Sequence, residues 1–166
     1  MYITLETKRL VIRPISLLDA EFLIDLVNSK EWLKFIGNRN ISNKKDADNY
    51  IENILNNKNF FYSIFELKES NRAIGIVTFL KRKEEEFPDL GFALLPGFEK
   101  KGYAFEACKK YLHAIKNLKE HKNIIAITMP GNQKSIVLLK KLGFNYVGDH
   151  TKNEEILSYY GLERVR

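Results

Sequence analysis

The chain has 166 residues, of which 45% are hydrophobic and 12% aromatic, and it carries a net charge of +6 at pH 7. This length and composition predict one compact domain, residues 1–166, with a sizeable core. No apolar run approaches the roughly 20 residues that cross a bilayer, and the N-terminus lacks the basic-then-apolar pattern of a secretory leader. We therefore expect a cytoplasmic protein without membrane contact. The single cysteine, Cys108, excludes a disulfide framework.

The positive charge comes mainly from lysine, with twenty lysines against seven arginines. Lysine lacks the planar guanidinium fork that reads bases and phosphates with two hydrogen bonds. We therefore expect no direct nucleic-acid partner. The sequence shows no metal-binding motif, so no metal is expected either.

The first third of the chain predicts a strand followed by helices. Residues 7–14 form a strand-like run, and 19–29 carry apolar residues at helical spacing. An aromatic-rich helical stretch follows at 31–36, and 45–55 form a longer amphipathic helix with Ser42 or Asn43 as its N-cap.

Three strand-like runs come next, at 60–67, 73–80 and 88–95, and they predict an antiparallel meander. The Lys/Glu-rich segment 81–86 separates the last two, and we interpret it as a solvated hairpin tip because charge runs of this kind usually face water.

The segment from Leu94 to Ala107 runs from a strand through a short turn into an amphipathic helix that extends to Leu118. Gly102 lies at the junction, where it lets the main chain approach a ligand closely. The first amides of the helix have no intrahelical acceptors and carry the positive end of the helix dipole, so an anion suits this turn. A plain strand-to-helix connection has the same pattern.

A second strand-turn-helix unit follows. The strand covers 124–129, and Asn132 is a natural N-cap for a helix that ends near Gly143. Residues 144–147 and 155–160 are plausible closing strands. The order of elements alone predicts an α/β or α+β domain with a mixed sheet.

These segments together resemble the GNAT acyltransferase superfamily, within it the branch of ribosomal-protein N-terminal (alanine/serine) acetyltransferases. The resemblance rests on four motifs in order: T-K-R-L-V-I-R-P from Thr7, G-Y-A-F-E-A from Gly102, N-Q-K-S from Asn132 and L-G-F from Leu142. It implies a mostly antiparallel sheet of about seven strands flanked by helices. It also implies that strands 89–95 and 124–129 splay apart to form a cleft for coenzyme A.

The resemblance implies acetyl-CoA as co-substrate, with its pyrophosphate on backbone amides of the turn, namely Lys100, Lys101, Gly102, Tyr103 and Ala104. The backbone of Phe92, Ala93 and Leu94 would pair with the pantetheine arm like an added strand. Glu99 departs from the family pattern and must point away from a phosphate, while Lys100 or Lys101 would supply positive charge.

The resemblance assigns catalytic roles to Asp89 and Ser135. Asp89 would take the amine proton, usually through water. A purely structural role, as a turn or strand-start aspartate after Pro88, fits the sequence equally well. Asn132 and Ser135 share a helix face; one would hydrogen-bond the cofactor or a structural water, and the other would lie near the sulfur. Leu139 stands where many relatives carry a tyrosine acid, so the acid is Ser135, water or nothing, and Ser135 also reads as a capping-turn residue.

The acceptor side falls on Trp32, Phe35 and Arg39, although the two aromatic residues also fit a core and Arg39 a loop tether. We expect a primary amine as acceptor, with a protein N-terminal α-amine favoured because it loses its proton more readily than lysine. A small-molecule amine (a polyamine, an amino sugar or an antibiotic) and a non-catalytic module binding coenzyme A or the ribosome are the alternatives. The protein is expected to be a monomer or a homodimer.

Overall fold

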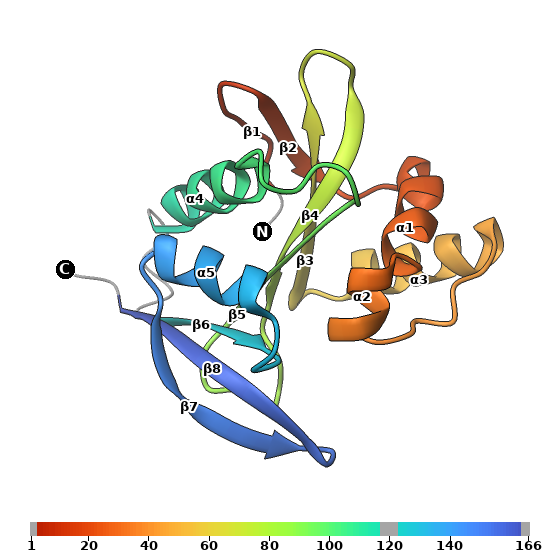
Figure 1. Cartoon of the computed structure of the whole chain (residues 1–166). Coiled ribbons are helices and arrows are strands. Elements are labelled where there is room, and N and C mark those ends of the chain that lie inside the picture. Colours follow the sequence, from red (N-terminus) through yellow and green to blue (C-terminus); the bar gives the residue numbers. More distant parts are fainter. Residues whose placement is uncertain (1–2, 117–122, 164–166) are drawn as a thin grey trace.

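The computed structural model describes residues 3–116 and 123–163, so Leu118 lies outside the described residues. Its elements follow the predicted order closely (Figure 1). They are β1 (Leu5–Glu6), β2 (Leu10–Pro14), η1 (Leu17–Asp19), α1 (Ala20–Val27), α2 (Lys30–Phe35), α3 (Lys44–Asn56), β3 (Phe60–Leu67), β4 (Arg72–Leu80), β5 (Asp89–Leu94), α4 (Tyr103–Lys116), β6 (Asn123–Thr128), α5 (Gln133–Lys141), β7 (Asn145–Lys152) and β8 (Glu155–Glu163).

The described strands form one sheet of eight in the order β1-β2-β3-β4-β5-β6-β8-β7. Neighbours are antiparallel except β5 and β6, which run parallel. The mixed, mostly antiparallel sheet is therefore confirmed. The count of about seven strands was one short, because the two residues of β1 are too few to show a period in the sequence.

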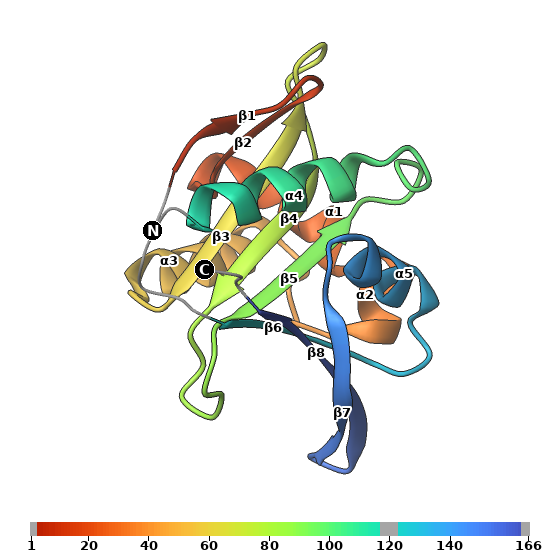
Figure 2. The same ribbon diagram turned by 90° about the vertical axis from the view of Figure 1, so that its left-hand side faces the viewer.

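Strands β5 and β6 touch at one end only. Their single paired position joins Asp89 to Ile125, where the Ile125 amide donates to the Pro88 carbonyl at 2.9 Å. Beyond it the two strands diverge, as Figure 2 shows. The expected splay is thus present, and it leaves one edge of β5 open in the middle of the sheet.

Helices cover both faces of the sheet, with α1, α2 and α3 on one side and α4 and α5 on the other (Figures 1 and 2). Adjacent strand residues point to opposite faces. Ile64 and Ile76 accordingly pack in the core under α1–α3, while Phe65 and Val77 pack in the core under α4. This double burial explains why the central strands read as nearly unbroken apolar runs.

The helix after Gly102 contributes its apolar stripe to the core under α4. Cys108 is fully buried there, and burial raises the pKa of its thiol far above the usual range, as befits the small core residue predicted from the sequence. None of the described helices combines the length and apolar character needed to cross a membrane.

The closing hairpin is longer than predicted. Strand β7 continues to Lys152 instead of ending at 147, and β8 reaches Glu163. Most of β7 is exposed, so no alternation of apolar residues marks its course. In Figure 1 this hairpin extends away from the rest of the sheet.

Candidate active site

A cavity of about 160 Å³ lies where β5 and β6 part, between α2 and α5. Eight of the residues singled out from the sequence line it: Trp32, Phe35, Arg39, Asp89, Phe92, Ala93, Asn132 and Ser135. They come from both halves of the chain. We call this cavity the central cleft. Tyr62, Thr78, Arg82 and Thr128 also line it, and the sequence analysis missed all four.

The open edge of β5 offers backbone groups to the cleft. The Leu95 amide donates a hydrogen bond of 2.8 Å to the Ile74 carbonyl on β4, so the backbone groups of Leu95 face β4. Residues of an antiparallel strand turn their backbone groups to alternate edges, so Ala93 faces β4, whereas Phe92 and Leu94 face the gap. Two of the three residues expected to bind pantetheine thus present amides and carbonyls in the required direction. Ala93 contributes its side chain to the wall instead.

Asp89 is the buried carboxylate of the central cleft, with 5% of its surface exposed. Its Oδ2 accepts a hydrogen bond from Arg82 Nε at 3.1 Å. Burial raises the pKa of the Asp89 carboxyl to about 6, although the Arg82 guanidinium acts to lower it. A carboxylate with such a pKa is ionised at neutral pH and still basic enough to accept a proton.

The segment 81–86 is more than the solvated tip predicted from its charges. Arg82 reaches inward to Asp89, and Glu85 accepts hydrogen bonds from Tyr159 Oη at 2.9 Å and Lys152 Nζ at 3.2 Å. The segment therefore docks on the β7–β8 hairpin, about seventy residues away in sequence. The sequence could not reveal this pairing because no local pattern links Glu85 to Lys152 and Tyr159, which lie on β7 and β8.

Helix α5 brings Asn132 and Ser135 to the cleft. Asn132 Oδ1 accepts a hydrogen bond from the Ser135 amide at 3.2 Å, which confirms the predicted N-cap. Leu139, one turn further along, is buried with 1% exposure and lines the cleft as an apolar residue. Ser135 is thus the hydroxyl that α5 places in the cleft.

The opposite wall of the cleft comes from α2 and the loop after it. Trp32 is buried, and its Nε1 donates to the Gly37 carbonyl at 3.1 Å. Arg39 is exposed at the rim, where its guanidinium lies 5.8 Å from the Trp32 ring and donates to the Ile36 carbonyl at 3.3 Å. Trp32 therefore has both a core role and a place in the cleft wall.

Tyr62 completes this wall from β3. Its ring meets Tyr50 edge-on, with 6.5 Å between centroids. Burial raises the pKa of the Tyr62 phenol, as does Tyr50, while the positive charges of Arg82 and Arg39 act to lower it. The phenol thus lies within electrostatic reach of both guanidinium groups, and this wall of the cleft is aromatic with a cationic rim.

The turn before α4 has the backbone expected of an anion site. Gly102 has φ +80° and Lys100 has φ +60°. The Glu106 amide donates to the Gly102 carbonyl, so the amides of Tyr103, Ala104 and Phe105 lie in the first turn, where a helix supplies no acceptor. Glu99 folds back to accept a hydrogen bond from the Gly97 amide at 2.7 Å, and Lys100 and Lys101 are exposed. We call residues 100–104 the phosphate turn.

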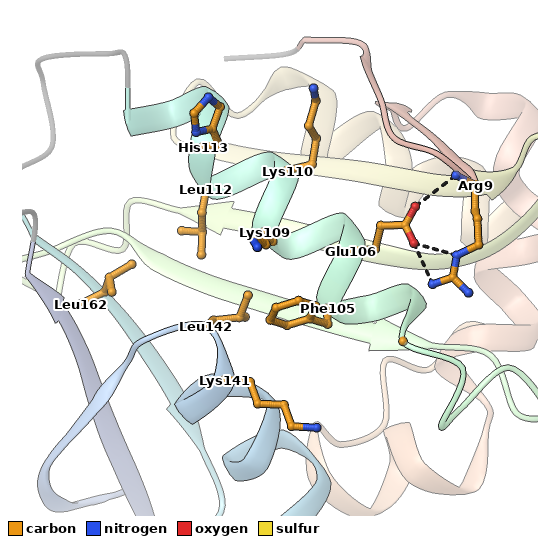
Figure 3. Close-up of a pocket in the computed structure, with 11 residues that line it drawn as sticks. Arg9, Phe105, Glu106, Lys109, Lys110, Leu112, His113, Lys141, Leu142 and Leu162 are labelled. Atoms are coloured by element: carbon orange, nitrogen blue, oxygen red, sulfur yellow. Dashed lines mark hydrogen bonds and ion pairs between the residues drawn. The ribbon is translucent and has the colours of Figure 1, made fainter.

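A second, larger hollow of about 740 Å³ begins at Gly102 and runs between α4 and α5 (Figure 3). Phe105, Leu112, Leu142 and Leu162 form its apolar surface. Lys109, Lys110 and Lys141 line it as well, and they give it a positive charge. This outer groove meets the phosphate turn at Gly102.

The described residues hold no group of three or more histidine, cysteine or acidic side chains that could bind a metal ion. His113 is exposed on α4, and the His150 ring packs edge-on against Tyr159 with 4.5 Å between centroids. Neither histidine lines the central cleft.

Comparison with known proteins assigns the family. The GNAT acetyltransferase domain matches residues 9–145. An uncharacterised N-acetyltransferase of Bacillus subtilis, YnaD, is 30% identical over 150 residues, which make up 89% of this chain and 85% of the relative. The chain therefore belongs to the GNAT acetyltransferases, which are acetyl-CoA-dependent acyltransferases.

Solved structures share the fold over nearly the whole chain. A GNAT acetyltransferase from Bacillus anthracis superimposes with a TM-score of 0.82 at 23% identity, covering 97% of this chain and 98% of that one. RimL, a ribosomal-protein α-N-acetyltransferase solved with coenzyme A, gives 0.84 at 12% identity, with coverages of 97% and 98%. MccE, a microcin self-immunity acetyltransferase solved with acetyl-CoA and AMP, gives 0.83 at 19%, with coverages of 95% and 94%.

Proposed function

We propose that this GNAT enzyme transfers the acetyl group of acetyl-CoA to a protein N-terminal α-amine by direct attack. One observation carries the proposal: a buried carboxylate with a pKa near 6 lies beside the open edge of β5, in a cleft with an aromatic opposite wall. The site thus offers a base, a backbone donor and an acceptor wall within one small cavity.

The residues present fit acetyl-CoA. The positive-φ turn and first-turn amides of α4 suit a pyrophosphate, and Phe92 and Leu94 offer the hydrogen bonds that an extended pantetheine chain requires. The lysines and Phe105 of the outer groove suit the phosphorylated adenosine end. Bound acetyl-CoA supplies an activated thioester.

The chain's own groups handle the protons. Asp89 accepts the proton that the attacking amine must lose, directly or through water, and the carboxyl becomes neutral. The Phe92 amide, which points into the gap, stabilises negative charge on the carbonyl oxygen. The C–S bond then breaks and the sulfur leaves as a thiolate. Ser135 or water protonates it, and a thiol pKa near 8.5 makes this last step undemanding.

Arg82 keeps the buried Asp89 carboxyl ionised at neutral pH. Burial alone raises the pKa of Asp89, and Arg82 counteracts it through its hydrogen bond and charge. The contacts of Glu85 with Lys152 and Tyr159 hold the segment that carries Arg82. We assign Arg82 as a positioning residue for the base.

The α-amine is favoured over lysine on energetic grounds. Deprotonating an α-amine of pKa 7.7 to 8.0 at pH 7 costs about 1 kcal/mol, whereas a lysine near 10.4 costs more than about 4 kcal/mol. A carboxylate with a pKa near 6 can accept a proton from an α-amine more easily than from a lysine, because the difference in pKa between the carboxyl and the α-amine is smaller. The aromatic wall of Trp32 and Phe35 provides apolar contact for the first side chain of the acceptor.

A small amine that also carries an anionic group is the second candidate. Arg39 stands at the rim of the cleft, and among the described residues it forms no ion pair with a carboxylate. MccE, which shares this fold, was solved in complex with both acetyl-CoA and AMP, a phosphate-bearing molecule.

A matched peptide pair tests the proposal. One peptide has a free N-terminus and blocked lysines; the other has a blocked N-terminus and one free lysine. Thiol release from acetyl-CoA, with mass spectrometry of the product, should show acetylation of the first peptide only. Turnover of anionic small amines with neither peptide acetylated would favour the second candidate. Binding of acetyl-CoA without turnover of any amine would point to the non-catalytic module.

A further inference from the structure

The motif T-K-R-L near the N-terminus contacts the helix that follows the phosphate turn. Glu106 on α4 receives four contacts from residues almost one hundred positions earlier, and Figure 3 shows those made by Arg9. Its Oε1 accepts from Thr7 Oγ1 at 2.6 Å and from the Arg9 amide at 3.1 Å. Its Oε2 lies 2.7 Å from both Nε and Nη2 of Arg9. Two of the motifs that define the resemblance to the family are thus partners in space.

The same guanidinium also contacts the phosphate turn. Arg9 Nη1 donates to the Lys101 carbonyl at 2.9 Å, and the guanidinium carbon lies 4.3 Å from the centre of the Tyr103 ring. A side-chain carbon added at Gly102 would lie 3.5 Å from Arg9 Nη2. The guanidinium therefore lies directly beside the turn and touches residues on both sides of Gly102.

The contact with the Lys101 carbonyl has a defined consequence for the backbone. A trans peptide is planar, and its carbonyl and amide point in opposite directions. When Arg9 holds the Lys101 carbonyl, it also fixes the Gly102 amide on the other side of that peptide. Glu106 holds the next carbonyl, that of Gly102, through its own amide at 3.0 Å. Both peptide units around Gly102 are thereby anchored.

We propose that Arg9 and Glu106 act as one positioning unit that holds the Gly102 amide toward the pyrophosphate of the co-substrate. The inference rests on the proposed function, because it presumes that the phosphate turn binds acetyl-CoA. Glu106 neutralises the charge of Arg9, and the guanidinium holds the Lys101 carbonyl instead of contacting the phosphates. The turn then presents ordered backbone amides to the phosphates. The unit therefore acts on the nucleotide half of acetyl-CoA and leaves the acetyl-pantetheine half alone.

Arg13 offers a matched comparison within the same N-terminal segment. It also pairs with carboxylates, at 2.8 Å from Asp19 and 2.9 Å from Glu66, and it lines neither hollow. Loss of Arg13 removes ion pairs of the same kind without touching the phosphate turn. Any effect shared by Arg9 and Arg13 variants is therefore a general effect on the fold.

The test compares acetyl-CoA with S-acetylpantetheine, which lacks the pyrophosphate. The variants are Arg9→Lys, Glu106→Gln and the control Arg13→Lys, each checked for a cooperative melting transition. We expect the KM for acetyl-CoA to rise about tenfold in Arg9→Lys and in Glu106→Gln, as for the loss of one hydrogen bond involving a charged group. The KM for S-acetylpantetheine and the kcat at saturation should stay at parent values in both. Calorimetry with coenzyme A and pantetheine supplies the same comparison without turnover.

The double variant Arg9→Lys/Glu106→Gln should have a KM for acetyl-CoA no higher than that of the more impaired single variant, since the two side chains act together. An equal rise in KM for acetyl-CoA and for S-acetylpantetheine would overturn the inference in favour of a purely structural role. The same rise in KM for acetyl-CoA in Arg13→Lys would do so too. Tighter coenzyme A binding by Glu106→Gln would overturn it too, because a released Arg9 would then be a direct phosphate ligand. If the parent neither binds nor uses acetyl-CoA, the proposed function itself fails and the inference with it.

Discussion

The two strand-turn-helix units, β5–α4 and β6–α5, have the same local architecture and different chemistry. Gly102 precedes α4 and has no side chain with which to cap the helix, and its φ of +80° opens the backbone. Asn132 precedes α5, and its side chain accepts a hydrogen bond from the Ser135 amide. Gly102 offers the first-turn amides of α4 no side-chain acceptor, whereas Asn132 satisfies one of the first-turn amides of α5. We therefore propose that the first unit binds acetyl-CoA through its backbone and the second through side chains.

The largest expected effect comes from a side chain added to the turn of the first unit. Gly102→Val forces a β-branched residue into a left-handed conformation, at a strain of roughly 1–2 kcal/mol or more, and distorts the turn. Coenzyme A binding by calorimetry should become undetectable while the protein still melts cooperatively. Gly131→Val in the second unit is the control, because Gly131 has no positive φ and an added carbon meets no atom within 4 Å. Equal coenzyme A affinity in both variants would show that the phosphate turn lies elsewhere.

The next effect concerns Asp89, which lies where the two units join. Asp89→Asn removes the base, so kcat should fall by about 10² to 10⁴ near pH 6.5 with little change in coenzyme A affinity. The loss should shrink toward pH 9, where the acceptor amine is already neutral. The parent should lose activity below about pH 6, as the Asp89 carboxyl becomes protonated. A loss that stays constant from pH 6 to 9 would mean a structural role for Asp89.

The same carboxyl should leave a signature in stability. Its pKa of about 6 in the folded protein lies above the value near 3.9 in an unfolded chain, so its contribution to stability is present below pH 4 and is lost as the pH rises through 6. Relative to the parent, the free energy of unfolding of Asp89→Asn should therefore rise between pH 4 and pH 8, by about 3 kcal/mol at most. Urea unfolding at both pH values measures this difference, and a pH-independent difference would contradict the raised pKa.

A smaller loss is expected from Ser135→Ala in the second unit. The thiolate can leave without an acid, so kcat should fall on the order of tenfold with good acceptors. Val137→Ala on the exposed side of the same helix, where half of the side chain is exposed, should leave activity unchanged. A hundredfold loss for Ser135→Ala would make this hydroxyl an obligatory proton donor.

The smallest effect separates capping from binding at Asn132. Asn132→Ala removes the side-chain acceptor of the N-cap and should destabilise the protein by about 1 kcal/mol. Asn132→Asp keeps an acceptor at the same place, so thermal unfolding should return to the parent value. If coenzyme A affinity falls in both variants, the Asn132 amide group contacts the co-substrate in addition to capping the helix.

Local rules in the sequence anticipated most of the elements and much of the central cleft. Helical spacing, the Asn132 cap and the glycine before α4 depend on residues within a few positions of each other, and each has a local physical cause. The family motifs added the splay of β5 and β6 and placed Asp89, Phe92 and Ser135 in one cavity, all of which the fold bears out. The order of elements within residues 3–116 and 123–163 could therefore be predicted from the sequence.

Tertiary structure decided the partners of charged residues. Arg82 belongs to a run of charges that predicts solvent exposure, yet it pairs with Asp89 because the segment is held by Lys152 and Tyr159 from the far end of the chain. Arg9 and Glu106 lie 97 positions apart, and neither has a local pattern that predicts the other. Ion pairs between distant segments depend on where whole elements pack, and a sequence records such packing only through apolar periodicity. Secondary structure and backbone turns were thus determined locally, whereas the charge environment of Asp89 and of the turn at residues 100–104 was determined by the fold.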